Sequence, residues 1–379
     1  MPAPLAALEL LCGDAQTFLD KVWASRIHLH HADADQLVRL LTFDDVDRLM
    51  TSTAIRTPAV RVAKNGSVLA SSAFTRQATL AGQPMTGLVD PRKVFDLFDD
   101  GATVVLQGLH RYWEPLGELV TDLELALGHP CQANAYLTPP GSQGFAVHQD
   151  THDVFVFQTY GRKVWEVHDG DQVHTVVLEP GVSMYLPTGT PHAARAEETA
   201  SLHVTIGINP LTWRGQLETA MAEALGPAGT QHLPAGYLDD PSRLADGLAD
   251  RVDALVDVLR NLDPAAVAAA ERQRFLTGRT LGQRGGLRDR LAARELTDDT
   301  LLVRRPGHPL EMSEEGDQVR LLLGDRDLTV PARLAPALQV VRDAEVLRPA
   351  DLAPHLDDRS RLVLCRRLVR EGLLAVSGT

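Results

Sequence analysis

The chain has 379 residues, of which 44% are hydrophobic and 23% charged, and its net charge at pH 7 is −13. This length predicts two or three domains, and the apolar fraction is ordinary for globular ones. The acidic balance argues against general nucleic-acid binding, which needs basic patches, whereas it suits a basic protein or peptide substrate as well as it suits plain solubility.

The first 130 residues mix helices with short strands. Helical spacing with acidic first turns predicts short helices at 33–41 and 43–50, and an amphipathic pattern predicts a longer one at 115–127. Residues 103–107 have the composition of a strand. We interpret this part as the helical front of one catalytic domain, which covers residues 1–212.

Short strands joined by Gly- and Pro-containing turns follow. The β-rich runs 154–158 and 163–167 flank a short link with a glycine, which predicts a hairpin. A Pro-Gly turn precedes a further strand that ends at Pro187, and 202–208 is a last short strand. This pattern is typical of a small antiparallel barrel or jelly roll, whose mouth is a common place for a ligand pocket.

A histidine–aspartate pair lies at the start of this β-rich region. Residues 144–150 predict a strand that enters a turn, and alternate side chains of a strand share a face, so His148 and Asp150 can reach one ion. His192 follows a tight corner after another strand. Two imidazoles and one carboxylate form the facial triad that holds Fe(II) and leaves positions open. Histidine–aspartate pairs also occur by chance, so the prediction depends on this strand context.

Lys163 begins the second strand of the predicted hairpin, and lysine is rare in this chain. Only four are present, Lys21, Lys64, Lys93 and Lys163. A lysine in an apolar strand is costly unless its ammonium group meets an anion, and the carboxylate of an organic co-substrate would supply one. The alternative is a surface lysine whose ammonium group reaches water from the outer face of the strand.

Several segments together resemble a known family. Residues 134–150, 153–158 and 161–165, followed by 180–192 and 201–205, are similar to the JmjC-type cupins of the ribosomal oxygenase group. The similarity is specific over residues 130–210 and looser elsewhere. It implies a double-stranded β-helix, the jelly roll of JmjC cupins, as the catalytic domain of an α+β protein.

The resemblance further implies an Fe(II)- and 2-oxoglutarate-dependent dioxygenase. Such an enzyme uses O₂ to hydroxylate a side chain of a protein, for example a ribosomal protein, or of a peptide. The matching positions are His148, Asp150 and His192 for the metal, Lys163 for the distal carboxylate of 2-oxoglutarate, Asn134 for a polar group beside co-substrate and metal, and Tyr136 for an aromatic residue at the substrate entrance.

Three neighbouring residues leave their roles open. His203 in the last strand either lines the substrate side of the pocket or is a hydrogen-bonded core histidine. His152 shares the strand parity of the His–Asp pair and could reach the metal, but its turn favours a substrate-side or solvated position. Gly207 stands where some relatives carry a hydroxyl residue, so the chain departs from the family pattern at a second co-substrate contact.

Past residue 209 the composition changes twice. Residues 213–302 are rich in Ala, Leu, Arg and Asp with apolar residues at helical spacing, which predicts a bundle of about three helices. In the resembled family this region dimerises, so we expect a homodimer. Residues 303–379 predict a hairpin at 319–330, two helices and a final strand, an arrangement that resembles a winged-helix module.

Winged helices often bind DNA, which supplies a rival hypothesis. The region holds 12 arginines and 12 acidic residues, so its net charge is zero and nucleic-acid binding is not expected. Arg366, Arg367 and Arg370 cluster on one predicted helix, where an exposed face with nearby acids is the simpler explanation.

Three functions are therefore compared. The leading hypothesis is a protein or peptide side-chain hydroxylase. One alternative is a small-molecule or natural-product-peptide hydroxylase with the same triad. The other is a regulator whose winged helix binds DNA while the cupin senses a ligand. The complete triad and the neutral C-terminal region count against the regulator.

The cysteines and the N-terminus bear on the compartment. Cys12, Cys131 and Cys365 are too few and too scattered for a disulfide framework or a zinc ribbon, which favours a reducing, cytoplasmic setting. The N-terminus lacks the basic segment of a signal peptide, and no apolar run approaches the ~20 residues of a membrane span. We therefore expect no membrane contact.

Overall fold

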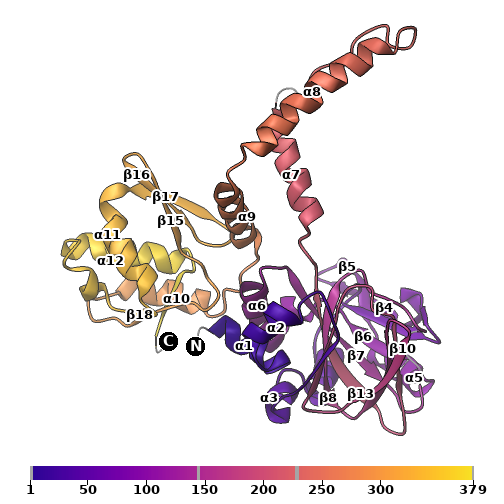
Figure 1. Cartoon of the computed structure of the whole chain (residues 1–379). Helices are drawn as coiled ribbons and strands as arrows, with labels where there is room; N and C mark the ends of the chain where they lie inside the picture. The colour runs from indigo at the N-terminus through magenta and orange to yellow at the C-terminus, as the bar shows by residue number, and fades with distance from the viewer. Residues whose placement is uncertain (1–2, 143–145, 227–229, 378–379) are drawn as a thin grey trace.

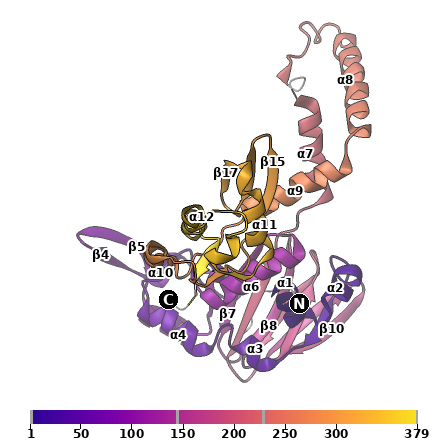
Figure 2. The same cartoon turned by 90° about the vertical axis from the view of Figure 1, so that its left-hand side faces the viewer.

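The computed structural model describes residues 3–142, 146–226 and 230–377 (Figure 1). An N-terminal α+β body and a smaller C-terminal body lie side by side, and a helical arm projects between them. Figure 2 shows the same arrangement from the side, with α7 and α8 running together away from both bodies.

Two antiparallel sheets form the centre of the N-terminal body. The larger has the strand order β1-β11-β8-β13-β7-β6-β2-β3 and the smaller has the order β10-β9-β12. The strands of the larger sheet are β1 (His28–His31), β2 (Val60–Lys64), β3 (Ser67–Val68), β6 (Thr103–Leu106), β7 (Cys131–Thr138), β8 (Asp153–Tyr160), β11 (Val182–Leu186) and β13 (Ser201–Ile208). Those of the smaller are β9 (Lys163–Asp169), β10 (Gln172–Leu178) and β12 (His192–Ala196). Their inner faces share one buried cluster that includes Val156 and Trp165, so the two sheets face each other as in a jelly roll.

Helices cover the outer face of the larger sheet. They are α1 (Ala3–Cys12), α2 (Ala15–Lys21), α3 (Ala34–Val38), α4 (Phe43–Ser52), α5 (Pro91–Asp99) and α6 (Glu114–Leu127), beside the hairpin of β4 (Thr75–Leu80) and β5 (Gln83–Val89). Phe18 of α2 packs edge-on against Tyr185, with ring centroids 4.9 Å apart, and both side chains are fully buried. The helices expected at 33–41, 43–50 and 115–127 are confirmed as α3, α4 and α6.

The strand expected at 144–150 is wrong for the residues that the structure describes. Residues 144 and 145 lie outside them, and residues 146–150 form a loop with a single β-bridge, His148 to His192. The reason is that, of residues 146–150, only His148 pairs with the free edge of β12, whose other edge is paired with β9. The bridge has two backbone hydrogen bonds, of 3.0 and 2.8 Å.

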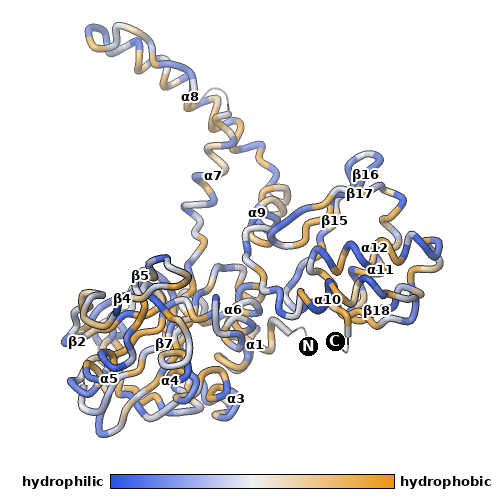
Figure 3. Tube along the Cα trace, turned by 180° about the vertical axis from the view of Figure 1, so that it is seen from behind, coloured by the Kyte–Doolittle hydropathy of each residue, from blue (hydrophilic) through white to orange (hydrophobic). Residues whose placement is uncertain are grey.

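The helical arm does not form the expected three-helix core within one chain. It consists of α7 (Trp213–Leu225) and α8 (Ser242–Arg260), which contact each other, and is followed by α9 (Pro264–Gly278). Among the described residues of these helices only Ala220 and Leu276 are buried. Figure 3 shows hydrophobic residues recurring along α7 and α8, outside both bodies. Helical periodicity predicted the helices correctly but could not tell what covers their apolar face.

The C-terminal body has its own hydrophobic core. It contains α10 (Gly286–Ala292), β14 (Leu302–Arg304), β15 (Glu311–Glu315), β16 (Gln318–Leu322), β17 (Asp327–Pro331), α11 (Ala335–Asp343), β18 (Val346–Leu347), α12 (Asp358–Arg370) and β19 (Leu374–Val376). The hairpin expected at 319–330 is confirmed as β16 and β17, paired from Leu322 to Asp327 across the turn. The helix expected at 359–370 is confirmed as α12.

A buried ion pair joins the two bodies. Arg279, whose side chain is 3% exposed, donates to the carboxylate of Glu124 at 3.0 Å and to the carbonyl oxygen of Thr121 at 3.0 Å. It also donates to the carbonyl oxygen of Gly307. A buried guanidinium group held by three partners fixes α6 against the start of the C-terminal body. Among the described residues, no helix is long and apolar enough to cross a membrane.

Candidate active site

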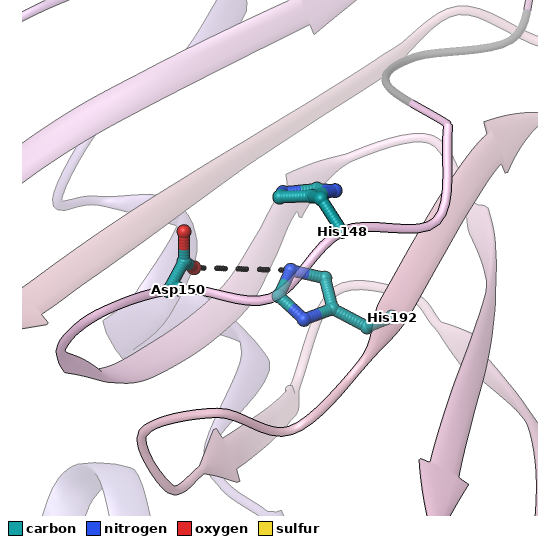
Figure 4. A group of neighbouring side chains, drawn as sticks. All are labelled: His148, Asp150 and His192. Atoms are coloured by element: carbon teal, nitrogen blue, oxygen red, sulfur yellow. Dashed lines mark ion pairs between the residues drawn. The ribbon is translucent and has the colours of Figure 1, made fainter.

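His148, Asp150 and His192 converge at the mouth of the two facing sheets (Figure 4). Their nearest ligand atoms all lie within 4.8 Å of one another, and His192 Nε2 is 3.8 Å from a carboxylate oxygen of Asp150. His148 and Asp150 come from the loop before β8, and His192 is the first residue of β12. The backbone bridge between the two histidines, rather than strand parity, brings the group together.

The backbone orients both imidazoles for metal binding. His148 Nδ1 lies 2.9 Å from the carbonyl oxygen of Ala146, and His192 Nδ1 lies 2.9 Å from that of Thr190. A carbonyl oxygen can only accept, so each Nδ1 carries the proton and each Nε2 keeps its lone pair for an ion. Burial lowers the pKa of His192, which favours the neutral, metal-binding imidazole. Two imidazole nitrogens and one carboxylate fit Fe(II) with positions left open.

A buried carboxylate fastens the corner that carries His192. Asp153, which is 2% exposed, accepts hydrogen bonds from the backbone and hydroxyl of Thr188, at 2.7 and 2.6 Å, and from the hydroxyl of Tyr185. Gly189 N donates to the carbonyl oxygen of Asp150 at 2.9 Å. The corner after β11 is therefore bound at two points to the segment that carries the other ligands.

Lys163 lies deep in the pocket with no anion beside it. Its side chain is buried, and Nζ donates to Thr138 Oγ1 at 3.1 Å. Among the described residues it has no ion-pair partner, and burial lowers its pKa to about 7. The surface position considered from the sequence is thus excluded. A buried ammonium group is costly unless an anion or hydrogen-bond acceptors compensate it.

Both sheets line one pocket of about 320 Å³. The larger sheet contributes Tyr136 and Asn134, and the side-chain Oδ1 of Asn134 accepts from Gly108 N at 3.0 Å. The ring of Tyr136 stacks on that of His203 at 4.9 Å, and His203 meets Trp165 edge-on at 5.4 Å. These three rings line the pocket together and are called the apolar wall below.

His203 lines this pocket rather than serving as a hydrogen-bonded core histidine. It is 4% exposed, and its Nδ1 has no hydrogen-bond partner among the described residues. Burial, with a contribution from the charge of Lys163, lowers its pKa well below the usual value. The ring is therefore neutral and available to a ligand.

The ring of His152 lies against Gly207, where the absence of a side chain leaves space for it. A Cβ atom on Gly207 would lie 2.8 Å from His152 Nε2, so glycine makes room for this imidazole over β13. His152 lines the pocket but is not in the group of three that could hold a metal ion. Any side chain at position 207 would therefore have to displace the ring of His152 from this position.

The comparisons with known proteins agree with this geometry. Residues 118–215 match the family model described as JmjC domain. Over these residues the chain is similar to JmjC domains. It is 35% identical over 185 residues to "Bifunctional lysine-specific demethylase and histidyl-hydroxylase NO66" of Branchiostoma floridae, covering 46% of this chain and 30% of that protein.

Other relatives extend the likeness. The chain is 28% identical over 221 residues to "Ribosomal oxygenase 1" of Homo sapiens, which covers 48% of this chain and 34% of that protein. The chain thus spans about a third of the length of these curated relatives. The structure of YcfD, a ribosomal oxygenase from Escherichia coli in complex with cobalt and 2-oxoglutarate, matches 97% of this chain and 99% of that one with a TM-score of 0.54. At 19% identity this shows a shared fold.

Sequence reasoning missed several residues of the JmjC pocket. Gln132 lines the pocket, and Thr138 accepts a hydrogen bond from Lys163. Both share the strand parity of Asn134 and Tyr136, so the alternation of β7 could have indicated them. Arg61, Gln107 and Trp165 also line the pocket. Arg61 and Gln107 gave no local signal, because their position depends on how β2 and β6 pair with strands far along the chain.

Replacing Asp153 by Asn should loosen the metal site. The amide keeps the shape of the side chain but puts a donor or a neutral oxygen where three donors meet, so we expect Co(II) affinity to fall about 10- to 100-fold, as for other residues that orient metal ligands. A titration of the metal-free protein followed by Co(II) absorbance measures this. The control is Asp171→Asn in the exposed turn after β9. Equal Co(II) affinity of the two variants would show that the metal site does not depend on the hydrogen bonds that Asp153 accepts.

Proposed function

We propose that the chain is an Fe(II)- and 2-oxoglutarate-dependent oxygenase that hydroxylates a side chain of a protein or peptide. The observation that carries the proposal is the pairing, in one pocket, of the His148–Asp150–His192 group with a buried Lys163 that has no anion. The names of the relatives, which are oxygenases and hydroxylases, and the 2-oxoglutarate bound by YcfD support it.

Different residues of the pocket would bind the metal and the co-substrate in such a reaction. With O₂ and 2-oxoglutarate, Fe(II) supplies the oxidising power that breaks an unactivated C–H bond. His148, Asp150 and His192 would hold the ion through two Nε2 atoms and a carboxylate. Lys163 and the hydroxyl of Thr138 would bind the distal carboxylate of 2-oxoglutarate. The rings of the apolar wall keep water from the reacting centre and leave the target carbon facing the metal.

The substrate proposed is a protein, with ribosomal proteins as the first candidates because the relatives are named ribosomal oxygenases. The net charge of −13 would attract a basic protein over long range. Cell lysate incubated with enzyme, Fe(II) and 2-oxoglutarate should yield proteins with single-oxygen mass shifts. If only small molecules gain oxygen, the small-molecule hydroxylase replaces this proposal.

Asp150→Ala should abolish the turnover of 2-oxoglutarate to succinate, because the remaining imidazoles cannot hold Fe(II) in place. Succinate release in the presence of lysate measures this, with circular dichroism to show that the fold is intact. Asp169→Ala, at the exposed end of β9, is the matched control and should turn over normally. Normal turnover by Asp150→Ala would mean that the metal site lies elsewhere.

Binding of 2-oxoglutarate should take up a proton at pH 8. Burial lowers the pKa of Lys163 to about 7, so the free group is mostly neutral at pH 8, whereas a bound carboxylate favours the charged form. Affinity should therefore fall as pH rises above 7, and the uptake should vanish at pH 6. Calorimetry on Co(II)-loaded protein in two buffers of different ionisation enthalpy measures the proton number.

Two variants complete this test. Lys163→Met should lose the proton uptake and bind 2-oxoglutarate at least about tenfold more weakly, because it removes a charge-assisted hydrogen bond. Lys93→Met, at a lysine that reaches only the carbonyl oxygen of Thr75 on the surface, should behave as the wild type. Proton uptake that persists in Lys163→Met would assign the co-substrate to another group.

We also propose a domain division of 1–212, 213–302 and 303–379, with a homodimer formed by the arm. The support is the exposed apolar side chains of α7 and α8, among them Trp213, Leu217, Leu248 and Val252. For the last region we propose a winged-helix-like module that contacts protein. Arg366 donates to the carbonyl oxygens of Ala293 and Leu296, and Arg367 pairs with Glu371, so these arginines serve the fold.

The mass in solution tests the dimer. Light scattering at micromolar concentration should give about twice the chain mass of 41.2 kDa. Leu248→Asp combined with Val252→Asp should give the single-chain mass, since two charges on the apolar face oppose its burial. Val173→Asp changes an equally exposed valine on β10 and should leave the dimer intact. A wild-type protein of single-chain mass would overturn the dimer.

A further inference from the structure

One charged side chain that lines the pocket has no role in the proposed function. The inference below rests on that proposed function. The charged residues that line the pocket are Arg61, Asp150 and Lys163. Asp150 belongs with the metal ligands and Lys163 with the distal carboxylate of the co-substrate. Arg61 remains, and its positive charge has no carboxylate partner among the described residues.

Strand register puts Arg61 on the same sheet face as Tyr136 and His203 of the apolar wall. Arg61 of β2 is opposite Val105 of β6, Val105 is opposite Tyr136 of β7, and Tyr136 is opposite His203 of β13. Residues opposite one another in an antiparallel pair point to the same face. Arg61 therefore extends the row of the apolar wall, three strand spacings or about 14 Å out from β13. Burial raises the pKa of Tyr136, and the positive charge of Arg61 opposes this rise.

Arg61 and Gln107 both present unused hydrogen-bonding atoms. Nε of Arg61 and the side-chain oxygen of Gln107 are buried and have no partner among the described residues. Gln107 N pairs with the carbonyl oxygen of Ala59, two residues before Arg61, so the side chains are diagonal neighbours on one face. Buried polar groups without partners are costly, so a ligand group that reaches them is bound strongly.

The chemistry of these groups selects the ligand. A guanidinium group is suited to two parallel hydrogen bonds with a carboxylate, and the amide of Gln107 can turn its nitrogen toward the same anion. Asp150 is the only acidic residue among those that line the pocket, so a lysine or arginine side chain would find no free carboxylate there. The acidic surface thus attracts a basic protein, whereas the pocket prefers an anion.

We propose that Arg61, assisted by Gln107, is the specificity-determining residue of the pocket and binds a carboxylate of the substrate, an aspartate or glutamate side chain at or next to the residue presented to the metal. The target segment is then an acidic site within a protein that is basic elsewhere.

Binding of three short peptides tests this without requiring turnover. The probes are acetyl-Ala-X-Ala-amide with aspartate, asparagine or arginine as X, added to the Co(II)- and 2-oxoglutarate-loaded protein. The paramagnetic ion broadens the peptide resonances that come near it. We expect the aspartate peptide to bind at least about tenfold more tightly than the other two, as charge-assisted hydrogen bonds require. Equal binding of the asparagine peptide, or tighter binding of the arginine peptide, would overturn the proposal.

Variants assign the effect to Arg61. Arg61→Gln should weaken the aspartate peptide at least about tenfold, Arg61→Lys should recover part of the loss, and Gln107→Leu should weaken it less. Arg92→Gln on the surface of α5 is the matched control. All should bind 2-oxoglutarate as the wild type does. Weaker co-substrate binding in Arg61→Gln would place Arg61 in the co-substrate site and refute the inference, whereas a wild type that binds no 2-oxoglutarate would refute the proposed function itself.

Discussion

The carboxylate of Asp153 is the constraint on which the site depends. It lies at the first position of β8, just after the loop that carries two metal-binding side chains, and it holds the corner that leads to the third. Tyr185, which donates to it, also accepts from Ala24 N at 2.9 Å. The Asp153 carboxylate therefore connects the larger sheet directly with the metal-binding corner, and it connects both with the turn after α2 through Tyr185.

The pocket behind this corner contains buried charged groups that lower the stability of the fold. Lowering the pKa of a lysine from 10.5 to about 7 corresponds to a destabilisation on the order of 5 kcal/mol of the charged form. Arg61 adds a second cation whose Nε is buried without a partner. Such groups are retained where a ligand completes them. Lys163 lies on β9 and Arg61 on β2. Two anionic groups of the same charge can therefore be bound at different positions in the pocket.

The sequence predicted best what short-range patterns encode. The strands β8, β9, β11 and β13 follow from β-rich runs bounded by turn residues. Lys163 stood out because lysine is rare and this one lies in an apolar strand. The prediction of a strand at 144–150 was wrong because composition alone does not show whether a segment has a partner strand. Among the described residues of this segment, only His148 pairs with another strand. Arg61 could not be predicted, because it reaches the row of His203 only through three successive strand pairings. Gln107 could not be predicted either, because it comes near the site only through the pairing of β6 with β7.

The helical arm leaves and rejoins the N-terminal body at one place. On departure, Asn209 N donates to the carbonyl oxygen of Pro130, and Leu211 N donates to Nδ1 of His129. On return, Arg279 binds Thr121 and Glu124. Both ends of the helical arm are thus hydrogen-bonded to residues 121–130 of the N-terminal body. Because loop-closure entropy rises only slowly with length, an arm tied in this way can gain or lose helical turns with little cost to the body below it. The reach of the arm and the chemistry of the pocket can therefore evolve separately.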